Sequence, residues 1–427
     1  MKPWPTRALA LLGLPALPLA FVALPLYVIW PHYFATQFGV SIGLIGALLL
    51  IARLLDALLD PLLGLGVDRL LQAGGVTLLR RSWLVAVTLA TGFLLLFFPH
   101  WLTGTNVTLD VLLGVVLAAL LTSYVCYSFL NIALQAWGAQ LGGDAASRSR
   151  LVGWREGLGL CGVVLASLVP GLWGMEALVS GFVCLLALSM WAWWFAPRPE
   201  PIITASPVKQ SLTGSLRQPW ANAGFRRLLL VFMLNSIASA IPATLMLFFV
   251  EDRLQLPQSL HSQFLGAYFF AAALSMPLWL QCIARVGLRV TWLTGMGMTV
   301  AVFIWALGLG AGDELAYTLV CLLSGLALGA DLIVPGALLN GLLQSPQHDQ
   351  THSGAYLGWW QVATKLNLAL AAGISLPLLQ WLGYSSGSRD APALLALSWA
   401  YALVPCLLKL LAAWVLFIST RHIQPME

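Results

Sequence analysis

The sequence predicts an all-α membrane protein that crosses the bilayer twelve times. Hydrophobic residues make up 60% of the 427 residues and charged residues only 9%, whereas a typical soluble domain contains about 25% charged residues. The mean hydropathy is +0.88. Apolar runs of roughly 20 residues, each long enough to span the hydrocarbon core as a helix, follow one another along the chain. These observations exclude an ordinary soluble domain.

The apolar runs form two sets of six. The expected helices lie near residues 8–31, 43–66, 83–99, 109–139, 151–172 and 177–195, then 227–250, 261–283, 291–311, 316–343, 354–380 and 393–418. A polar stretch rich in Pro, Ser and basic residues separates the sets, as is typical of a linker. We therefore expect an N-terminal six-helix bundle over residues 1–197, a cytoplasmic linker over 198–226 and a C-terminal six-helix bundle over 227–427.

The first helix contains Pro15, Pro18 and Pro25 and no charged residue, so we expect it to be kinked. It follows Lys2 and Arg7, as the apolar core of a secretory signal would. Its apolar run continues too far for a signal peptide, and we expect a retained helix.

The distribution of basic residues predicts the orientation. Fifteen of the 21 Lys and Arg residues fall in loops on the side of the N-terminus, against two, Arg253 and Arg389, on the other side. By the positive-inside rule both termini are cytoplasmic. The net charge of +5 therefore reflects topology, and no nucleic-acid partner is expected.

Three charged residues interrupt the second helix, at Arg53, Asp56 and Asp60. At about 100° per residue these positions share one narrow stripe of a helix. Charges at mid-membrane are costly, so the stripe should face protein or water rather than lipid. It is a candidate ion site; the alternative is an internal Arg–Asp clamp that binds no ligand.

Polar side chains also follow one face of the fourth helix, at Tyr124, Tyr127, Asn131 and Gln135, with Ser128 beside them. This face can meet the charged stripe of the second helix. The alternative is hydrogen-bonded packing between helices.

The fifth helix opens with the adjacent pair Arg155 and Glu156. Adjacent residues point to different sides of a helix. We therefore expect Arg155 to face the cavity while Glu156 contacts a neighbouring helix.

The second set of helices carries fewer charges. Lys365 follows Gln361 by four residues, which places a cation and an amide on one face. Asp331 is expected either to join the charge network or to neutralise Lys365. Lys409 lies within the last helix, and we expect its long side chain to extend towards the cytoplasmic end.

The six cysteines lie in apolar segments and the six histidines at or beyond helix ends. No two of the cysteines have the short spacing of metal ligands, and the histidines have no close ligand partners. We expect the cysteines to be small buried hydrophobic residues, and we expect neither a disulfide, a transition-metal site nor a cofactor.

Three stretches resemble the melibiose permeases, the glycoside-pentoside-hexuronide:cation symporters of the major facilitator superfamily. The first is HYFATQFGVSIGLIGALLLIARLLDALLDPLLGLGVD, which contains G-x-S-x-G-x-x-G and A-R-x-x-D-A-x-x-D-P. The others are LVGWREGLGLCG and QVATKLNLALAAGISLPLLQWLGY. The resemblance covers nearly the whole chain and implies the major facilitator fold, with two six-helix bundles.

The resemblance also implies roles for individual residues. Asp56 and Asp60 match the carboxylates that coordinate the coupling cation, and Ser128 matches a hydroxyl ligand. Arg155 and Lys365 match basic residues of the substrate cavity. The expected cation ligands are Asp56, Asp60, Ser128 and Asn131, the expected substrate ligands are Arg155, Lys365, Gln135, Tyr127 and Gln361, and Arg53 and Asp331 complete the charge network.

The chain departs from the family pattern in its sugar pocket. Asn131 replaces a shared carboxylate, Gln135 replaces a stacking Trp, and the first helix lacks a sugar-binding Asp. We therefore expect a symporter whose cation site is retained and whose solute differs from that of the family.

The expected function is cation-coupled transport, with Na⁺ or H⁺, of a glycoside-like or acidic organic solute by alternating access. If the ion is Na⁺, Asp56 and Asp60 bind it. One alternative is transport of an amphipathic lipid such as a lysophospholipid. Another is an intramembrane Mg²⁺-dependent prenyl-transferring enzyme, although a second acidic cluster is missing from the sequence. We expect a monomer in the bilayer of a bacterial inner membrane.

Overall fold

A computed structural model describes residues 4–38, 40, 42–103, 108–141, 143–199, 212–257, 260–345, 353–384, 387 and 389–419. These residues form helices joined by turns, and no β-strand occurs among them. The chain divides into two compact units. The first consists of Met1–Gly143, Arg150–Pro219 and Pro346–Val362, and the second of Asp144–Ser149, Trp220–Ser345 and Ala363–Glu427.

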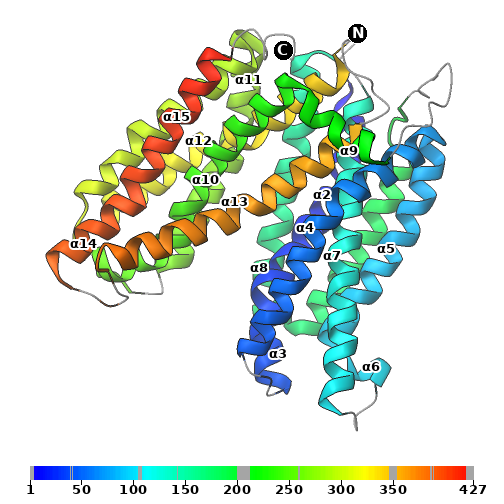
Figure 1. The fold of residues 1–427 in the computed structure, drawn as a ribbon, viewed down its shortest axis with the longest axis horizontal. Helices are drawn as coiled ribbons and strands as arrows, with labels where there is room; N and C mark the ends of the chain where they lie inside the picture. Colours follow the sequence, from blue (N-terminus) through cyan, green and yellow to red (C-terminus); the bar gives the residue numbers. More distant parts are fainter. Residues whose placement is uncertain are drawn as a thin grey trace. The chain divides into compact units, whose positions relative to one another are not determined.

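The first unit contains most of the N-terminal half of the chain and the start of α13 (Ser353–Trp381). Its other helices are α1 (Thr6–Gly13), α2 (Ala16–Leu24), η1 (Pro25–Ile29), α3 (Trp30–Phe38), α4 (Ile42–Gln72), α5 (Gly75–Phe97), α6 (His100–Thr103), α7 (Leu109–Gln140), most of α8 (Ala145–Trp194) and most of α9 (Leu212–Ala221). α7 packs along both α4 and α5 (Figure 1).

The predicted first helix is interrupted at its prolines. α1 ends at Gly13, α2 begins after Pro15, and the π-helical turn η1 starts at Pro25. Proline lacks the backbone N–H that would continue the helical hydrogen bonds, which explains the position of the breaks. The regular α-helix is thus interrupted at two of the three prolines, whereas Pro18 lies inside α2, and the expected kinks stay a prediction.

The second unit contains most of the C-terminal half of the chain. Its helices are α10 (Ala223–Phe248), η2 (Phe249–Arg253), α11 (His261–Phe303), η4 (Ile304–Gly308), α12 (Glu314–Gln344), the remainder of α13, α14 (Ala391–Ser398), η6 (Trp399–Leu403) and α15 (Val404–Ile418). α11 packs against α12, and α15 packs against α10 (Figure 1).

One helix in each unit, α8 in the first and α11 in the second, turns sharply at a glycine. Gly174 in α8 has φ 83° and ψ 179°, and Gly287 in α11 has φ 81° and ψ 170°. Glycine enters this region without the steric penalty of a side chain. Each turn lies between two predicted helices: α8 contains 151–172 and all but the last residue of 177–195, and α11 contains 261–283 and the first part of 291–311, which continues in η4 to Gly308.

Among the described residues, ten helical stretches are long and apolar enough to cross a membrane. One of them, Gln263–Gly308, has 46 residues and contains the turn at Gly287, so it supplies two crossings. α4 is not among the ten, yet its 31 residues include the predicted second helix. All twelve predicted helices are thus helical in the structure.

The domain boundaries expected from the sequence stay a prediction. Part of the expected linker, residues 200–211, lies outside the described residues. The rest includes α9 and the start of α10, so residues 212–221 are helical where the sequence suggested a polar connection.

Aromatic side chains fill the interior of each unit. In the first unit the Trp30 indole at the start of α3 donates a hydrogen bond to the Leu96 carbonyl of α5 at 2.8 Å, which connects these two helices. In the second unit the rings of Phe249 and Tyr401 stack at 4.1 Å, and the hydroxyls of Tyr401 and Tyr317 are 2.7 Å apart. Buried hydroxyls are thereby paired with each other, as an apolar interior requires.

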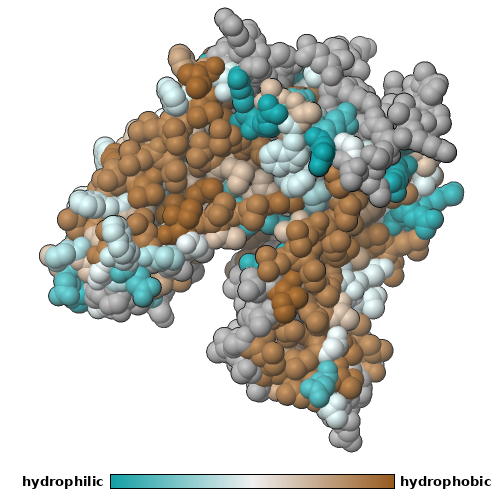
Figure 2. Space-filling view, viewed as in Figure 1, coloured by the Kyte–Doolittle hydropathy of each residue, from teal (hydrophilic) through white to brown (hydrophobic). Residues whose placement is uncertain are grey.

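Large apolar side chains cover much of the visible surface along the helices of both units (Figure 2). Leu58 of α4 and Leu410 of α15 are among the exposed ones. Apolar surface of this extent suits contact with lipid. Cys161 and Cys184 are also exposed, so the prediction that every cysteine is buried is wrong for these two.

The backbones of α4 and α13 come into close contact inside the first unit. A methyl group added to Gly64 would lie 2.0 Å from the Gly354 carbonyl oxygen, so only glycine fits this crossing. One turn further along α4, the Asp68 carboxylate accepts hydrogen bonds from the amides of Gly354 at 2.6 Å and Ala355 at 3.1 Å. Asp68 therefore caps the start of α13, whose first amides have no partner within their own helix.

Candidate functional site

The two carboxylates of α4 form the centre of the candidate site. Asp56 is 2% exposed and Asp60 is fully buried, whereas Leu54 and Leu58 on the other side of the helix are exposed. α4 therefore turns an apolar side outward and its carboxylates inward. The Ser128 hydroxyl of α7 donates a hydrogen bond to Asp56 Oδ1 at 2.9 Å. Two of the residues predicted to bind a cation are thus in direct contact.

The polar face of α7 lies beside these carboxylates. The Tyr127 hydroxyl lies beside the Asn131 side chain and within electrostatic range of Asp56 and Asp60. Asn131 and Gln135 are half-buried on the same helix. α7 therefore provides hydroxyl and amide groups next to a pair of buried acids.

Arg53 lies at the edge of this cluster rather than within it. Its side chain is exposed, and its guanidinium lies beside the hydroxyl of buried Tyr124 on α7. In the three-residue stripe predicted on α4, the two acidic side chains are therefore buried and the arginine is exposed. Tyr124 was part of the predicted polar face but was not among the expected ligands.

Arg155 and Glu156 of α8 form an ion pair. Arg155 Nη2 lies 2.8 Å and Nε 3.1 Å from Glu156 Oε1, and the two side chains are 19% and 29% exposed. The prediction that these neighbours point to different sides is wrong, because the long Arg side chain folds back onto the adjacent carboxylate. Glu156 also lies within electrostatic range of Tyr127, so the pair belongs to the region around α4 and α7.

The predicted ligands on α13 are divided between the units. Gln361 belongs to the first unit and Lys365, one helical turn further on, to the second. Both side chains are half-buried. The structure groups Gln361 with the unit of the α4 carboxylates and Lys365 with the other unit.

Asp331 pairs with a residue that the sequence analysis did not assign to the charge network. Lys409 Nζ lies 2.5 Å from Asp331 Oδ2 and donates a second hydrogen bond to Asn235 Oδ1 at 2.8 Å. The Trp292 indole donates to Asp331 Oδ1 at 2.9 Å. Lys409 is only 3% exposed, so the prediction that it extends towards the cytoplasmic end is wrong. Its position within an apolar helix was the signal of a buried partner.

The atoms around α4 are of the type that hard cations prefer. Asp56, Asp60, Ser128 and Asn131 provide carboxylate, hydroxyl and amide oxygens. Within the described part of the chain, no group of three or more His, Cys, Asp or Glu residues is arranged to hold a metal ion. Oxygen donors of this kind suit a hard cation better than a transition metal, for which nitrogen and sulfur ligands are typical, and the carboxylates can also take up a proton.

Comparison with known proteins identifies similar transporters. The chain matches the family model for the MFS/sugar transport protein over residues 11–420. It is 26% identical to the inner membrane symporter YicJ of Escherichia coli over 260 residues, which cover 58% of this chain and 55% of YicJ. It is 25% identical to the putative glycoside/cation symporter YagG of Escherichia coli over 247 residues, 55% of this chain and 52% of YagG. The matches span about half the length of these relatives.

Solved structures of transporters share the fold. A bacterial homologue of the iron transporter ferroportin, in an outward-facing state, has a TM-score of 0.70 and 16% identity, over 97% of this chain and 99% of that one. The human organic anion transporter MFSD10 has a TM-score of 0.61 and 20% identity, over 97% and 100% of the two chains. The E. coli fucose:proton symporter FucP has a TM-score of 0.64 and 14% identity, over 95% and 97%. The predicted major facilitator fold is confirmed.

Proposed function

This chain belongs to the MFS/sugar transport protein family, and on that premise we propose that it couples the movement of a small solute to that of Na⁺ or H⁺. It is a multi-pass membrane transporter and not an enzyme. Its relatives YicJ and YagG are named as a symporter and a putative glycoside/cation symporter. We extend cation symport to this chain, in a bacterial inner membrane, with both termini cytoplasmic.

The contact between Asp56 and Ser128 is the observation that carries the proposal. It joins two helices inside the first unit, and Asp60 lies one turn away on the same face of α4. Burying two acids close together is unfavourable unless their charge is balanced. A bound cation neutralises part of that charge, and its coordination holds oxygens of α4 and α7 together around the ion.

Coupling follows from the difference that the cation makes to the carboxylates. Without the ion, Asp56 and Asp60 repel each other and attract the basic residues of the cavity; with it, they are neutralised. If one arrangement of the helices binds the cation better, the ion shifts the equilibrium towards that arrangement. Cation and solute then increase each other's affinity by the same factor.

Both candidate ions are compatible with the residues present. Na⁺ would take oxygens from Asp56, Asp60, Ser128 and Asn131, whereas H⁺ would be shared by the two acids. Na⁺ binding requires the oxygens of Ser128 and Asn131, and proton binding does not. Replacing Ser128 by Ala should therefore weaken coupling to Na⁺ much more than coupling to H⁺.

We propose a glycoside-like or acidic organic compound as the solute. The ion pair of Arg155 with Glu156 offers hydrogen-bond donors and acceptors side by side, which suits sugar hydroxyls. Lys365 and the amides of Gln135 and Gln361 add further groups for hydroxyls or a carboxylate. An acidic compound would depend most on Lys365.

Uptake by proteoliposomes tests the proposal directly. The parent protein is screened with labelled glycosides and organic acids under an imposed Na⁺ or proton gradient. Asp56→Asn and Asp60→Asn should abolish uptake against a gradient, because a neutral amide keeps the size of the side chain and removes its charge. Asp110→Asn is the matched control, since Asp110 is an exposed acid in the first turn of α7.

Two outcomes decide the role of the carboxylates. Loss of concentrative uptake in Asp56→Asn and Asp60→Asn, with Asp110→Asn fully active, supports the coupling site. If both α4 variants concentrate the solute as well as the parent does, these acids are not the coupling site and the proposal fails.

A further inference from the structure

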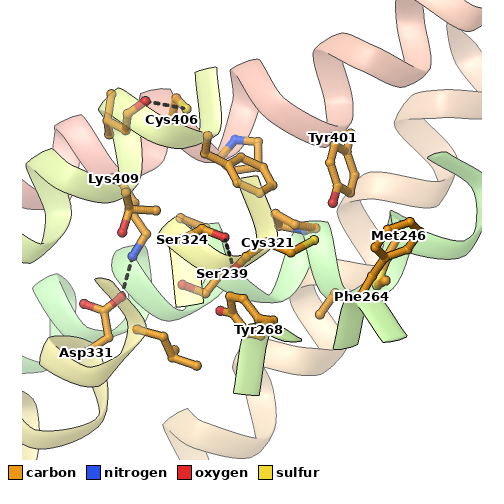
Figure 3. Close-up of a pocket in the computed structure, with 18 of the residues that line it drawn as sticks. Ser239, Met246, Phe264, Tyr268, Cys321, Ser324, Asp331, Tyr401, Cys406 and Lys409 are labelled. Carbon is orange, nitrogen blue, oxygen red and sulfur yellow. Dashed lines mark hydrogen bonds and ion pairs between the residues drawn. The ribbon is translucent and has the colours of Figure 1, made fainter. Parts of the chain in front are cut away.

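A cavity of about 110 Å³ lies inside the second unit, which does not contain the carboxylates of α4. Residues of α10, α11, α12, η6 and α15 line it (Figure 3). Phe264, Tyr268, Phe303 and Tyr401 supply aromatic walls. Protein interiors are close-packed, so an apolar space of this size forfeits contacts that an occupant would restore.

One end of the cavity is polar. Asp331 of α12 and Lys409 of α15 both line it, and Figure 3 shows Lys409 reaching across to Asp331. The pair has no net charge, so an ionic ligand would disturb the balance between the two residues. A neutral polar group would not.

The hydrogen-bonding capacity of this pair suits a hydroxyl group. An ammonium has three donors, and those of Lys409 have two acceptors among the described residues, Asp331 Oδ2 and Asn235 Oδ1. A carboxylate has about four acceptor positions, and the described donors to Asp331 are Trp292 and Lys409. The pair can therefore give one hydrogen bond and accept another, which matches a hydroxyl that accepts one and donates one.

The size and lining of the cavity suit one aromatic ring. The volume of about 110 Å³ is smaller than that of an engineered apolar cavity of about 150 Å³ that holds benzene, so the occupant has at most one ring and extends towards the open side of the cavity. Tyr268, which lines the cavity, offers an edge or a face for the offset contacts that aromatic rings prefer. Leu265 and Phe269 line the cavity and are 39% and 37% exposed, so it reaches the surface of the unit there.

We propose that this cavity is a binding site for a neutral compound made of one aromatic ring and a hydroxyl group, of the benzyl alcohol class. The ring lies against Tyr268 and Leu328, next to the polar end of the cavity. The hydroxyl donates to the Asp331 carboxylate and accepts from the Lys409 ammonium. This site is distinct from the proposed cation site, and it stands or falls independently of the transported solute.

Fluorine NMR of the purified transporter in nanodiscs tests the site, with 4-fluorobenzyl alcohol as the probe. Parent protein should broaden the probe signal saturably, and unlabelled benzyl alcohol should reverse the broadening. 4-Fluorotoluene, which lacks the hydroxyl, should bind several-fold to about tenfold more weakly, the factor that one ordinary net hydrogen bond gives. 4-Fluorobenzoate should bind more weakly still, because its charge disturbs the ion pair.

Matched variants connect the binding to this cavity. Ser324 lines it and is 5% exposed, and its hydroxyl bonds to the Cys321 carbonyl of its own helix. Ser324→Leu should fill the space and abolish saturable binding, whereas Ser324→Ala should keep it. Replacing the ion pair by Lys409→Met together with Asp331→Leu should keep the walls and remove the preference for the alcohol over 4-fluorotoluene.

Several outcomes would overturn the proposal. One is equal binding by the parent and Ser324→Leu. Another is broadening that matches that of empty nanodiscs, which would indicate partition into lipid. A third is tighter binding of 4-fluorobenzoate than of the alcohol, and a fourth is stronger displacement by 1-decanol than by benzyl alcohol, which would indicate an acyl chain.

Discussion

The strongest structural prediction concerns Asp68, whose carboxylate caps the start of α13. It accepts hydrogen bonds from Gly354 at 2.6 Å and Ala355 at 3.1 Å, and it is 3% exposed. Asp68→Asn keeps the shape of the side chain, but its amide has only one oxygen. One of the two backbone N–H groups would then face another N–H, and the second would keep a weaker, neutral hydrogen bond.

The expected cost follows from these two contacts. A hydrogen bond to a charged group contributes about 1.5–3 kcal/mol and a neutral one about 0.5–1.5 kcal/mol. In Asp68→Asn one hydrogen bond to the charged carboxylate is lost and the second becomes a weaker, neutral one. Together these two changes should destabilise the start of α13 by about 2–4 kcal/mol. Since each 1.4 kcal/mol is a factor of ten, exchange of these amides with deuterium should accelerate at least about 30-fold.

Hydrogen–deuterium exchange followed by mass spectrometry measures this effect on peptides that cover residues 353–358. Asp110→Asn is the control, because exposed Asp110 lies in the first turn of its own helix; such a surface change is usually within about 0.5 kcal/mol. Peptides from the middle of α5 should exchange as in the parent and show that the fold persists. Unchanged exchange at residues 353–358 in Asp68→Asn, or an equal change in Asp110→Asn, would refute the capping role.

Three further predictions concern the buried ion pair, the topology and the solute. Lys409→Met should destabilise the protein by about 3–5 kcal/mol in denaturant titrations, because it leaves the Asp331 charge without its partner. Adding Asp331→Leu should recover part of this loss but not all of it, since Trp292 and Asn235 then lose their hydrogen bonds; a double variant that loses as much as the sum of the two single changes would contradict the ion pair. A cysteine introduced at Asp313 should react with an impermeant reagent added outside sealed cells and one at Ser206 should not, and equal labelling would exclude cytoplasmic termini. If the solute is an anion, Lys365→Met should weaken its binding by about 2 kcal/mol in proteoliposomes; a neutral glycoside that binds tightest and is unaffected would exclude an anionic solute.

The sequence predicted the helices because each one is recorded locally, in a run of apolar residues. It predicted their ends less well: α4 continues to Gln72 and α5 begins at Gly75, beyond the apolar runs, because charged residues such as Arg80 are good helix formers outside the hydrocarbon core. At Gly174 and at Gly287 a sharp turn joins two helices that the apolar runs predict as separate. The sequence predicted both helices in each pair, but not that they follow each other with only a glycine turn between them.

The candidate site was predictable to the extent that its residues share a helix face. The spacing of Asp56 and Asp60 places both acids on one side of α4, and the spacing on α7 places polar groups together. Contacts between distant residues have no such local record. Lys409 reaches Asp331 over 78 positions and Asp68 reaches Gly354 over 286, and neither partner follows from periodicity. Arg155 shows a further limit, since a long side chain can fold back onto its neighbour whatever direction its Cβ takes.

The two units contain buried acids with different partners, and the difference bears on where a coupling ion would bind. Asp331 is held by the Lys409 ammonium, which has donors only and cannot act as a ligand to a cation. Asp56 is held by the Ser128 hydroxyl, which donates to the carboxylate and can also turn its lone pairs towards a cation. Exchanging a hydrogen bond for a metal–oxygen contact needs only a rotation about one bond at Ser128. At Asp331 a cation would have to displace a buried ammonium, at the cost of leaving that charge without its partner. The coupling ion is therefore expected in the first unit, and Ser128 is the residue that lets the site change from its empty to its occupied state.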